Sequence, residues 1–277
     1  MSFLDDIVAR TRARLRDAPM DVEDDRLAAR QAAAARSPFA FSAALGGAPS
    51  VAQAILPARA DKIVCATPIK LIAEIKAASP SAGAIVDDPD VETIAADYAR
   101  GGAAAISVVT EPEYFRGSTA WIRLAGQAGL PVLMKDFILE PSQLQRGVAA
   151  GASAILLLAS LLDGKQIRRF ISLLDEFGCD ALVEVHDERE LERAVDGGAR
   201  LIGVNNRNLR DFAVDLATAE KLGSMIPNGA LKVAESGIKT ASDVARLAAA
   251  GYHAFLVGES LLRQNDRAAA VRALVQR

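Results

Sequence analysis

The chain has few of the residues that form disulfide frameworks or metal centres. It contains 2 cysteines, Cys65 and Cys179, and 2 histidines in 277 residues. Two cysteines cannot form a disulfide framework, and neither has the close spacing of a metal-binding pair. We therefore expect neither a disulfide-stabilised fold nor a metal site.

Aromatic side chains, long apolar runs and an excess of one charge are also lacking. Aromatic residues make up 5% of the chain and hydrophobic residues 51%, so we expect an ordered protein with an aliphatic core. The longest apolar stretch, near 154–162, is about half a membrane span. The net charge of −3 argues against nucleic acid or an anionic membrane as a partner. Because the chain starts with acidic residues rather than a secretory signal, it is predicted to be soluble and cytoplasmic.

From residue 69 onward, an apolar run, a polar turn, an amphipathic segment and a glycine recur in that order. The glycines suit the left-handed position after a helix and are Gly102, Gly129, Gly151, Gly178, Gly198, Gly229 and Gly251. The eight apolar runs are 71–76, 104–110, 131–137, 154–160, 181–186, 201–206, 231–235 and 254–258. Eight strands alternating with helices predict parallel pairing. The even spacing favours a closed (β/α)8 TIM barrel over a doubly wound open sheet.

The first 68 residues do not follow this pattern. Residues 3–35 have helical periodicity and many charges, and residues 50–60 are Ala-rich and are also predicted to be helical. These segments are too short to bury an independent core. We therefore expect one domain, in which an N-terminal helical extension (1–68) packs on a catalytic barrel (69–277).

Charged residues interrupt the apolar runs near their C-terminal ends. They are Glu74, Lys76, Lys135, Glu184 and Glu235. Since the C-terminal ends of barrel strands line the mouth, these five groups should converge there. A structural ion-pair network is one reading of such a cluster. Paired lysines and carboxylates also shift one another's pKa values, as acid–base catalysis requires, so Lys76 and Lys135 are the leading catalytic candidates.

Three other titratable residues lie near this cluster in the sequence. His186 follows Glu184 by two positions and could face the mouth, although a histidine at a strand end is more often merely solvated. His253 precedes the last strand, at the opposite end of the barrel. Asp136 has the opposite parity to Lys135, which indicates a structural role.

Glycine-containing turns follow the seventh and eighth strands, as Ser236-Gly237 and Gly258-Glu259-Ser260. Barrels often bind phosphate at this pair of loops through backbone N–H groups and a helix N-terminus. A Ser-Gly turn alone is a weak signal, but the two turns together predict a phosphate site. After the first strand, residues 79–83 predict a flexible polar loop at the same mouth.

With these motifs in order, the sequence resembles the indole-3-glycerol-phosphate synthase family over about residues 70–265. The matching motifs are LIAEIKAASPS (71–81), TE (110–111), YFRGS (114–118), MKDFI (134–138), ALVEVH (181–186), IGVNNRNL (202–209), AESGI (234–238) and LVGES (256–260). The resemblance implies the conversion of 1-(2-carboxyphenylamino)-1-deoxyribulose 5-phosphate to indole-3-glycerol phosphate, with loss of carbon dioxide and water. It implies no cofactor, a small-molecule substrate and, we expect, a monomer.

The resemblance also assigns roles to residues. Lys135 would be the general acid that protonates the ribulose carbonyl, Lys76 would hold the substrate carboxylate and assist the later dehydration, and Glu184 would stabilise the cationic intermediate and transfer protons. The other expected residues orient these groups or bind substrate: Glu74, Asn205, Glu235, Ser79, Phe115, Phe137 and Arg207. Phosphate would be held, largely through backbone N–H groups, by Ser236, Gly237, Gly258 and Glu259.

Two features depart from the family pattern, and two alternatives stay open. Ala77 and Ala82 stand where members often carry lysines, which could weaken attraction for the anionic substrate, and segment 49–69 is longer than usual. A phosphoribosylanthranilate isomerase barrel would need a Cys/Asp pair at strand ends, but Cys179 precedes the fifth strand. An inactive scaffold barrel should have lost a lysine or glutamate of the site, and all are present.

Overall fold

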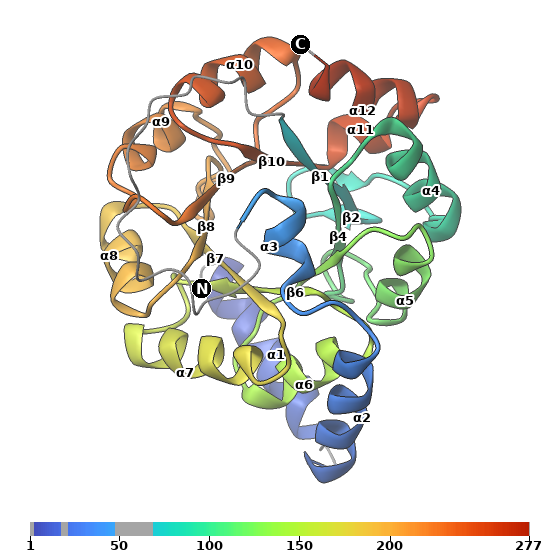
Figure 1. Cartoon of the computed structure of the whole chain (residues 1–277), viewed down its shortest axis with the longest axis vertical. Coiled ribbons are helices and arrows are strands. Elements are labelled where there is room, and N and C mark those ends of the chain that lie inside the picture. The colour runs from blue at the N-terminus through green and yellow to red at the C-terminus, as the bar shows by residue number, and fades with distance from the viewer. Residues whose placement is uncertain (1–2, 18–21, 48–68, 277) are drawn as a thin grey trace.

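The computed structural model describes residues 3–17, 22–47 and 69–276. Parallel strands form a closed ring at the centre, and helices surround it (Figure 1). Around the ring the strand order is β1-β10-β9-β8-β7-β6-β5-β4, and β1 also pairs with β4 to close it. The predicted (β/α)8 barrel is confirmed.

The strands of the barrel lie within, or one residue before, the apolar runs of the sequence. They are β1 (Lys70–Ile75), β4 (Ala105–Val109), β5 (Val132–Lys135), β6 (Ala154–Leu158), β7 (Asp180–Val185), β8 (Leu201–Asn205), β9 (Leu231–Glu235) and β10 (Ala254–Val257). The helices that follow are α4 (Val91–Gly101), α5 (Ala120–Gly126), α6 (Pro141–Ala149), α7 (Gly164–Asp175), α8 (Glu188–Asp196), α9 (Ala217–Gly223), α10 (Ala241–Ala249), α11 (Glu259–Leu262) and α12 (Arg267–Val275).

Side chains at the helix ends explain why the segments between strands fold as helices. Asp163, Asp187 and Thr240 each accept a hydrogen bond from the backbone N–H three residues later, at the start of α7, α8 and α10. All seven glycines that end the repeated pattern have positive φ, from 57° at Gly178 to 102° at Gly151. A side chain would be strained in that conformation, which is why glycine suits these positions. Gly102 caps α4 directly, as expected, whereas Gly229 lies six residues after the end of α9, in a separate turn.

Alternating residues of each strand divide the core into two layers. Ile72, Leu133 and Leu182 belong to the cluster that fills the barrel. Their neighbours Leu71 and Val183 belong to the larger cluster between strands and helices. The inward residues Ile72, Leu133, Leu182 and Val233 are each followed two positions later by a charged one: Glu74, Lys135, Glu184 and Glu235. The charges therefore lie toward the C-terminal ends of these strands, which positions the site at one mouth.

The described residues of the N-terminal extension form helices, in agreement with the helical periodicity of 3–35. They are α1 (Phe3–Asp17), α2 (Val22–Ala34) and α3 (Ala40–Ala44). Helix α2 packs along α6, and α3 crosses the front of the barrel in Figure 1. There Asp180, the first residue of β7, accepts a hydrogen bond from the Ser42 backbone N–H.

The predicted helix over 50–60, the long segment 49–69 apart from Ile69, and Cys65 lie outside the described residues. The division at residue 68 therefore stays a prediction. Among the described helices, none combines the length and the apolar character needed to cross a membrane.

Candidate active site

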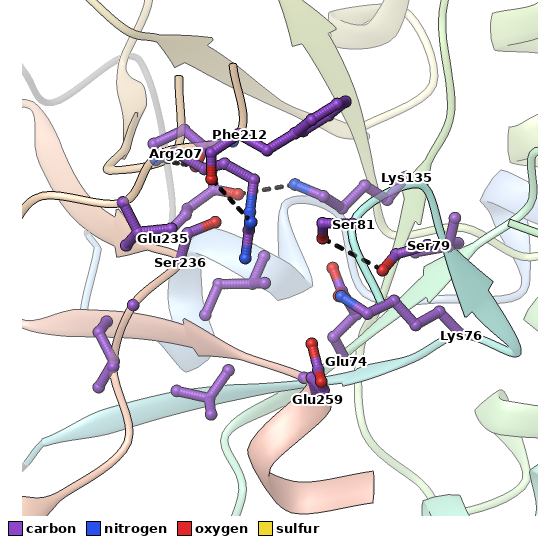
Figure 2. Close-up of a pocket in the computed structure, with 18 of the residues that line it drawn as sticks. Glu74, Lys76, Ser79, Ser81, Lys135, Arg207, Phe212, Glu235, Ser236 and Glu259 are labelled. Atoms are coloured by element: carbon purple, nitrogen blue, oxygen red, sulfur yellow. Dashed lines mark hydrogen bonds and ion pairs between the residues drawn. The ribbon is translucent and has the colours of Figure 1, made fainter. Parts of the chain in front are cut away.

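The C-terminal mouth of the barrel opens into a cavity of about 750 Å³ (Figure 2). Every site residue expected from the sequence lines this cavity: Glu74, Lys76, Ser79, Phe115, Lys135, Phe137, Glu184, Asn205, Arg207, Glu235, Ser236, Gly237, Gly258 and Glu259. Their convergence follows from closure of the ring, because these residues come from the ends of different strands and the loops after them.

Lys135, at the end of β5, lies between two carboxylates from other strands. Its Nζ donates to Glu235 Oε2 at 2.7 Å and to Glu184 Oε2 at 3.0 Å. Burial lowers the pKa of Lys135, but the charges of Glu184, Glu235 and Glu74 reverse this effect and raise it above its usual value. Lys135 therefore carries a proton at neutral pH.

The two carboxylates beside Lys135 have opposite protonation behaviour. The pKa of Glu184 lies well below its usual range, because Lys135 and His186 outweigh the effect of burial. The pKa of Glu235 is raised to about 7, by burial and by the nearby charge of Glu184, despite the opposing charge of Lys135. Glu235 Oε1 is buried and has no hydrogen-bond partner among the described residues. One carboxylate of the pair is thus firmly ionised and the other titrates near neutrality.

Asn205 and His186 complete the surroundings of Glu184. Asn205 Nδ2 donates to Glu184 Oε1 at 3.1 Å. His186 Nε2 is 3.3 Å from the same oxygen, and Nδ1 is 2.9 Å from Glu190 Oε2. The expectation that His186 is merely solvated is wrong, because its side chain is 14% exposed and sits between two glutamates.

On the opposite side of the cavity, Lys76 and Glu74 form a second pair. Lys76 Nζ donates to Glu74 Oε1 at 2.5 Å, and both groups come from the end of β1 (Figure 2). Gly258 packs directly on this carboxylate, since a Cβ at position 258 would lie 2.6 Å from Glu74 Oε1. Gly203 packs in the same way on Glu235, with a corresponding distance of 2.2 Å to Oε1.

The polar segment after β1 is an ordered hairpin rather than the flexible loop predicted. Strand β2 (Ala78–Ser79) pairs with β3 (Gly83–Ala84) in antiparallel register. The hydroxyl of Ser79 accepts from the Ala82 backbone N–H at 3.2 Å, and Ala78 N–H donates to the Phe115 carbonyl at 3.1 Å. The sequence did not predict this backbone pairing, because strands of two residues are too short to show an alternation of polar and apolar side chains.

Aromatic side chains form one wall of the cavity. The rings of Phe115 and Phe137 have centroids 6.3 Å apart, and Phe3 packs edge-on against Phe137 and Phe212. Sequence reasoning missed Phe3 and Phe212 as lining residues. Their positions depend on how α1 and the segment after β8 fold over the mouth, and no motif in the sequence indicates this.

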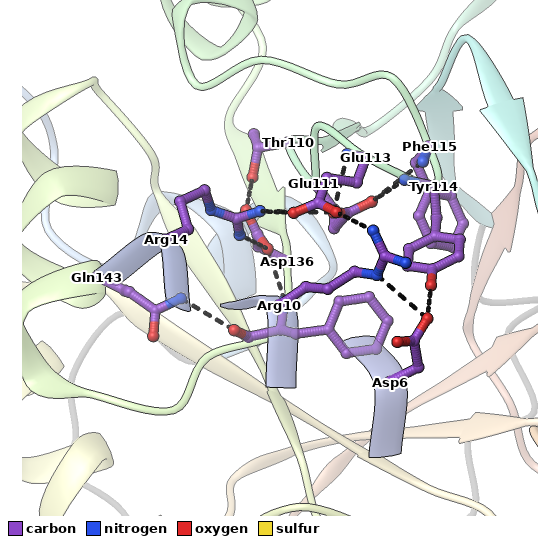
Figure 3. A network of polar contacts seen from close by, with 11 residues as sticks. Asp6, Arg10, Arg14, Thr110, Glu111, Glu113, Tyr114, Phe115, Asp136 and Gln143 are labelled. Carbon is purple, nitrogen blue, oxygen red and sulfur yellow. Dashed lines mark hydrogen bonds and ion pairs between the residues drawn. The ribbon is translucent and has the colours of Figure 1, made fainter. Parts of the chain in front are cut away.

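Helix α1 is tied to the aromatic wall by a polar network (Figure 3). Glu111 accepts hydrogen bonds from three consecutive backbone N–H groups, those of Glu113, Tyr114 and Phe115. Arg14 of α1 lies 3.6 Å from Glu111 and 4.0 Å from Asp136. The network therefore fixes the loop that carries Phe115.

Asp136 belongs to the same network and also lines the cavity, so the structural role expected of it stays a prediction. It accepts a hydrogen bond from the Thr110 hydroxyl at 2.6 Å and another from the Phe137 N–H at 2.8 Å. Burial raises the pKa of Asp136, although these two donors oppose the change.

The two glycine turns expected to bind phosphate lie next to each other, after β9 and β10. Ser236 and Gly237 both have positive φ, 64° and 80°, which forms a tight turn at the cavity. The carboxylate of Glu259 pairs with Arg263 at 3.0 Å, and the expected binding of phosphate by its backbone stays a prediction. Ser260 Oγ is buried without a hydrogen-bond partner in the described part of the chain. It also lines the cavity and was not among the expected site residues.

Comparison with known proteins identifies the family of the chain. The sequence profile of indole-3-glycerol phosphate synthase matches residues 7–274. The chain belongs to the indole-3-glycerol phosphate synthase family. An indole-3-glycerol phosphate synthase from Chlorobium luteolum is 50% identical over 194 residues, covering 70% of this chain and 74% of that protein. The one from Lactiplantibacillus plantarum is 47% identical over 207 residues, covering 74% and 80%.

Solved structures of lower identity agree with the fold alone. Thiamine phosphate pyrophosphorylase from Pyrococcus furiosus has a TM-score of 0.56 at 17% identity, with 75% of this chain and 94% of that chain covered. The family assignment rests on the sequence matches. It argues against the alternative that the chain is a phosphoribosylanthranilate isomerase. Cys179 agrees with this conclusion, since it is buried before β7, where burial raises its pKa to about 12.

Proposed function

We propose that the cavity catalyses the decarboxylating and dehydrating ring closure of 1-(2-carboxyphenylamino)-1-deoxyribulose 5-phosphate to indole-3-glycerol phosphate. Family membership supplies the reaction, and the relatives carry the same name. The observation that carries the residue assignment is Lys135, a protonated amine held by two carboxylates inside the cavity. Such a group can deliver a proton to a carbonyl oxygen without help from solvent.

Lys135 is the general acid for carbon–carbon bond formation. As the aromatic carbon that bears the carboxylate attacks the ribulose carbonyl carbon, the carbonyl oxygen takes a proton from Lys135 Nζ and becomes a hydroxyl. The carbon–carboxylate bond then breaks, carbon dioxide leaves, and its electron pair restores the aromatic ring. Glu184 stabilises the positive charge on the substrate nitrogen in this step, because its pKa well below the usual range keeps it ionised.

Lys76 acts at both ends of the sequence of steps. It first pairs with the substrate carboxylate, which the apolar wall of Phe115 and Phe137 shields from water. After decarboxylation it protonates the departing hydroxyl, while Glu184 accepts the proton released as the indole double bond forms. Water is the second product. The two lysines give up two protons and Glu184 gains one, which it can return to Lys135 at 3.0 Å. Lys76 regains its proton from solvent, and this is the one proton that the decarboxylation consumes.

The remaining residues orient the substrate. Glu74 accepts a hydrogen bond from Lys76, and Asn205 donates one to Glu184. Glu235 accepts a hydrogen bond from Lys135. The anthranilate part of the substrate contacts Ser79, Phe115, Phe137 and Arg207. The phosphate binds to Ser236, Gly237, Gly258, Glu259 and the unpartnered hydroxyl of Ser260.

The proposal is tested by turnover. Purified protein is mixed with the carboxyphenylamino substrate in the presence of a chelator, and formation of the fluorescent indole product is followed. We expect saturable turnover without added metal or cofactor. Saturable substrate binding without product would refute the enzymatic function while leaving a binding role.

We also propose that the protein works as a cytoplasmic monomer without a nucleic-acid partner. In the described residues, the large exposed apolar side chains lie on separate elements, Leu27 on α2, Val195 on α8, Val214 in a loop and Met225 after α9. Scattered apolar residues are typical of monomer surfaces. Size-exclusion chromatography with light scattering should give a mass near 29.1 kDa, and a dimer mass would contradict this proposal.

A further inference from the structure

His186 is a partly buried titratable residue beside the site that the proposed steps do not use. It directly follows β7, and its side chain is 14% exposed. It does not line the cavity, whereas Glu184 does. Any influence of His186 on the chemistry must therefore act through Glu184.

Glu190 anchors His186 from the first turns of α8. Its Oε2 accepts a hydrogen bond from the His186 backbone N–H at 2.8 Å and lies 2.9 Å from the ring Nδ1. The start of α8 is itself capped by Asp187, whose side chain accepts from the Glu190 N–H at 2.9 Å. The position of the ring is thus set by the main chain on both sides of it.

The free edge of the ring faces Glu184. His186 Nε2 is buried and has no aligned hydrogen-bond partner among the described residues, and Glu184 Oε1 lies 3.3 Å away. The other oxygen of Glu184 accepts from Lys135, and Asn205 donates to Oε1. The carboxylate of Glu184 therefore has a lysine at one oxygen and the histidine and an amide at the other.

We propose that protonated His186, anchored by Glu190, is a positioning residue that orients the Glu184 carboxylate and keeps it ionised beside Lys135. The inference rests on the proposed role of Glu184 in proton transfer. That role needs an ionised carboxylate as the proton acceptor. A second cation on the side of Glu184 away from Lys135 favours the ionised form and does not enter the cavity.

The charges around the ring support this arrangement. Burial lowers the pKa of His186, but Glu184 from β7 and Glu190 from α8 together raise it to about 10. Arg193 of α8 approaches Glu190 at 3.9 Å, and Lys135 of β5 lies on the far side of Glu184. Two carboxylates in direct contact outweigh these more distant cations, so the ring stays charged at neutral pH.

Steady-state kinetics of His186→Gln, Glu190→Gln and Glu188→Gln test the proposal. His186→Gln should lower kcat by ~10-fold or more with KM changed by less than ~3-fold, because Glu184 and not substrate binding is affected. Its acid limb in the kcat–pH profile should move to higher pH, since Glu184 loses a neighbouring cation. Glu190→Gln should match the wild type near pH 6 and approach His186→Gln near pH 9, as the ring loses its proton.

Glu188→Gln is the matched control. Glu188 is an exposed residue of the same helix that pairs with Lys221, so its substitution should leave the profile unchanged. Wild-type kcat and an unshifted acid limb in His186→Gln would overturn the proposal. A fall in kcat with an unshifted limb would also overturn it, since that result indicates a merely structural role.

A spectroscopic readout separates this inference from the proposed function. The chain has 2 histidines, so a side-chain ¹⁵N spectrum shows 2 imidazoles, and His186→Gln assigns them. We expect a protonated His186 ring near pH 8 in the wild type and a neutral one in Glu190→Gln. A neutral wild-type ring would overturn the inference whatever the activity. Absence of turnover in the wild type would refute the proposed function, while the ring charge would still decide the Glu190–His186–Glu184 arrangement.

Discussion

Two lysines face the same cavity from different kinds of surroundings. Lys76 has one carboxylate partner, Glu74, which lies two residues earlier, near the end of β1. Lys135 has two, Glu184 and Glu235, which are 49 and 100 residues away in the sequence. The side chains of the two lysines have similar exposure, 17% and 19%. Local sequence is enough to pair Lys76, whereas the surroundings of Lys135 exist only once the barrel has closed.

This difference agrees with the separate roles proposed for the two lysines. A lysine with one local carboxylate can release it and take up the substrate carboxylate in exchange. A lysine held between two buried carboxylates keeps its proton and its position until the carbonyl arrives. We therefore expect substitutions on the β1 side to affect binding as well as rate, and those on the β5–β7–β9 side to affect mainly the rate.

The largest expected effect is that of Lys135→Met compared with Lys76→Met. Lys135→Met should lower kcat by ~1,000-fold, in the range for loss of a general acid, with binding of the product indole-3-glycerol phosphate retained. Lys76→Met should raise KM as well as lower kcat. Stopped-flow turnover and product titration measure both, with circular dichroism and thermal unfolding as controls of the fold. Retained turnover in Lys135→Met would show that the acid is wrongly assigned.

A smaller effect is expected when a methyl group is added beneath each carboxylate. Gly203→Ala would place a Cβ 2.2 Å from Glu235 Oε1, and Gly258→Ala would place one 2.6 Å from Glu74 Oε1. We expect kcat to fall by ~10-fold in Gly203→Ala, because a displacement of a catalytic group by a fraction of an ångström weakens proton transfer. Gly258→Ala should also raise KM, since it touches the phosphate turn.

Gly126→Ala is the control for these two variants. A Cβ at position 126 would have no heavy atom within 4 Å among the described residues, so activity should be unchanged. Equal losses of kcat and unchanged KM in Gly203→Ala and Gly258→Ala would abolish the distinction between the two sides.

The smallest expected effect is a pH dependence of stability that belongs to Glu235. Its folded-state pKa of about 7 lies above the ordinary 4.5. Its contribution to stability is therefore complete below the unfolded-state pKa and is lost as the pH rises through about 7. Between pH 5 and 8 the unfolding free energy of the wild type should fall relative to that of Glu235→Gln by roughly 2–3 kcal/mol, because most of the difference between the two pKa values is titrated in this range. Urea unfolding measures this difference, and a constant difference across the range would contradict the assignment.

Much of the barrel could be predicted from short-range pattern. The apolar runs locate all eight strands, and the seven glycines mark chain reversals, because both signals depend on the local backbone and on burial of successive residues. The parity of Glu74, Lys135, Glu184 and Glu235 within their strands also predicted which face they share.

The rest of the site depends on contacts that periodicity does not encode. The hairpin β2–β3 forms through backbone pairing in a segment of few residues. Phe3 reaches the cavity because α1 is held over the mouth through contacts such as that of Arg14 with Glu111. The buried position of His186 results from Glu190, one turn into the next helix, and a lone histidine at a strand end gives no sign of this.

By itself, then, the sequence determined the number and order of strands, the helix ends and the residue types at each strand end, since these follow from local conformational preference and burial. It also identified the family through those strand-end motifs. Tertiary structure alone decided which charges meet: Lys135 with Glu184 and Glu235, and His186 between Glu184 and Glu190. The physical reason is that Coulomb and hydrogen-bond energies depend on distances of a few ångströms in a low-dielectric interior, and ring closure sets those distances.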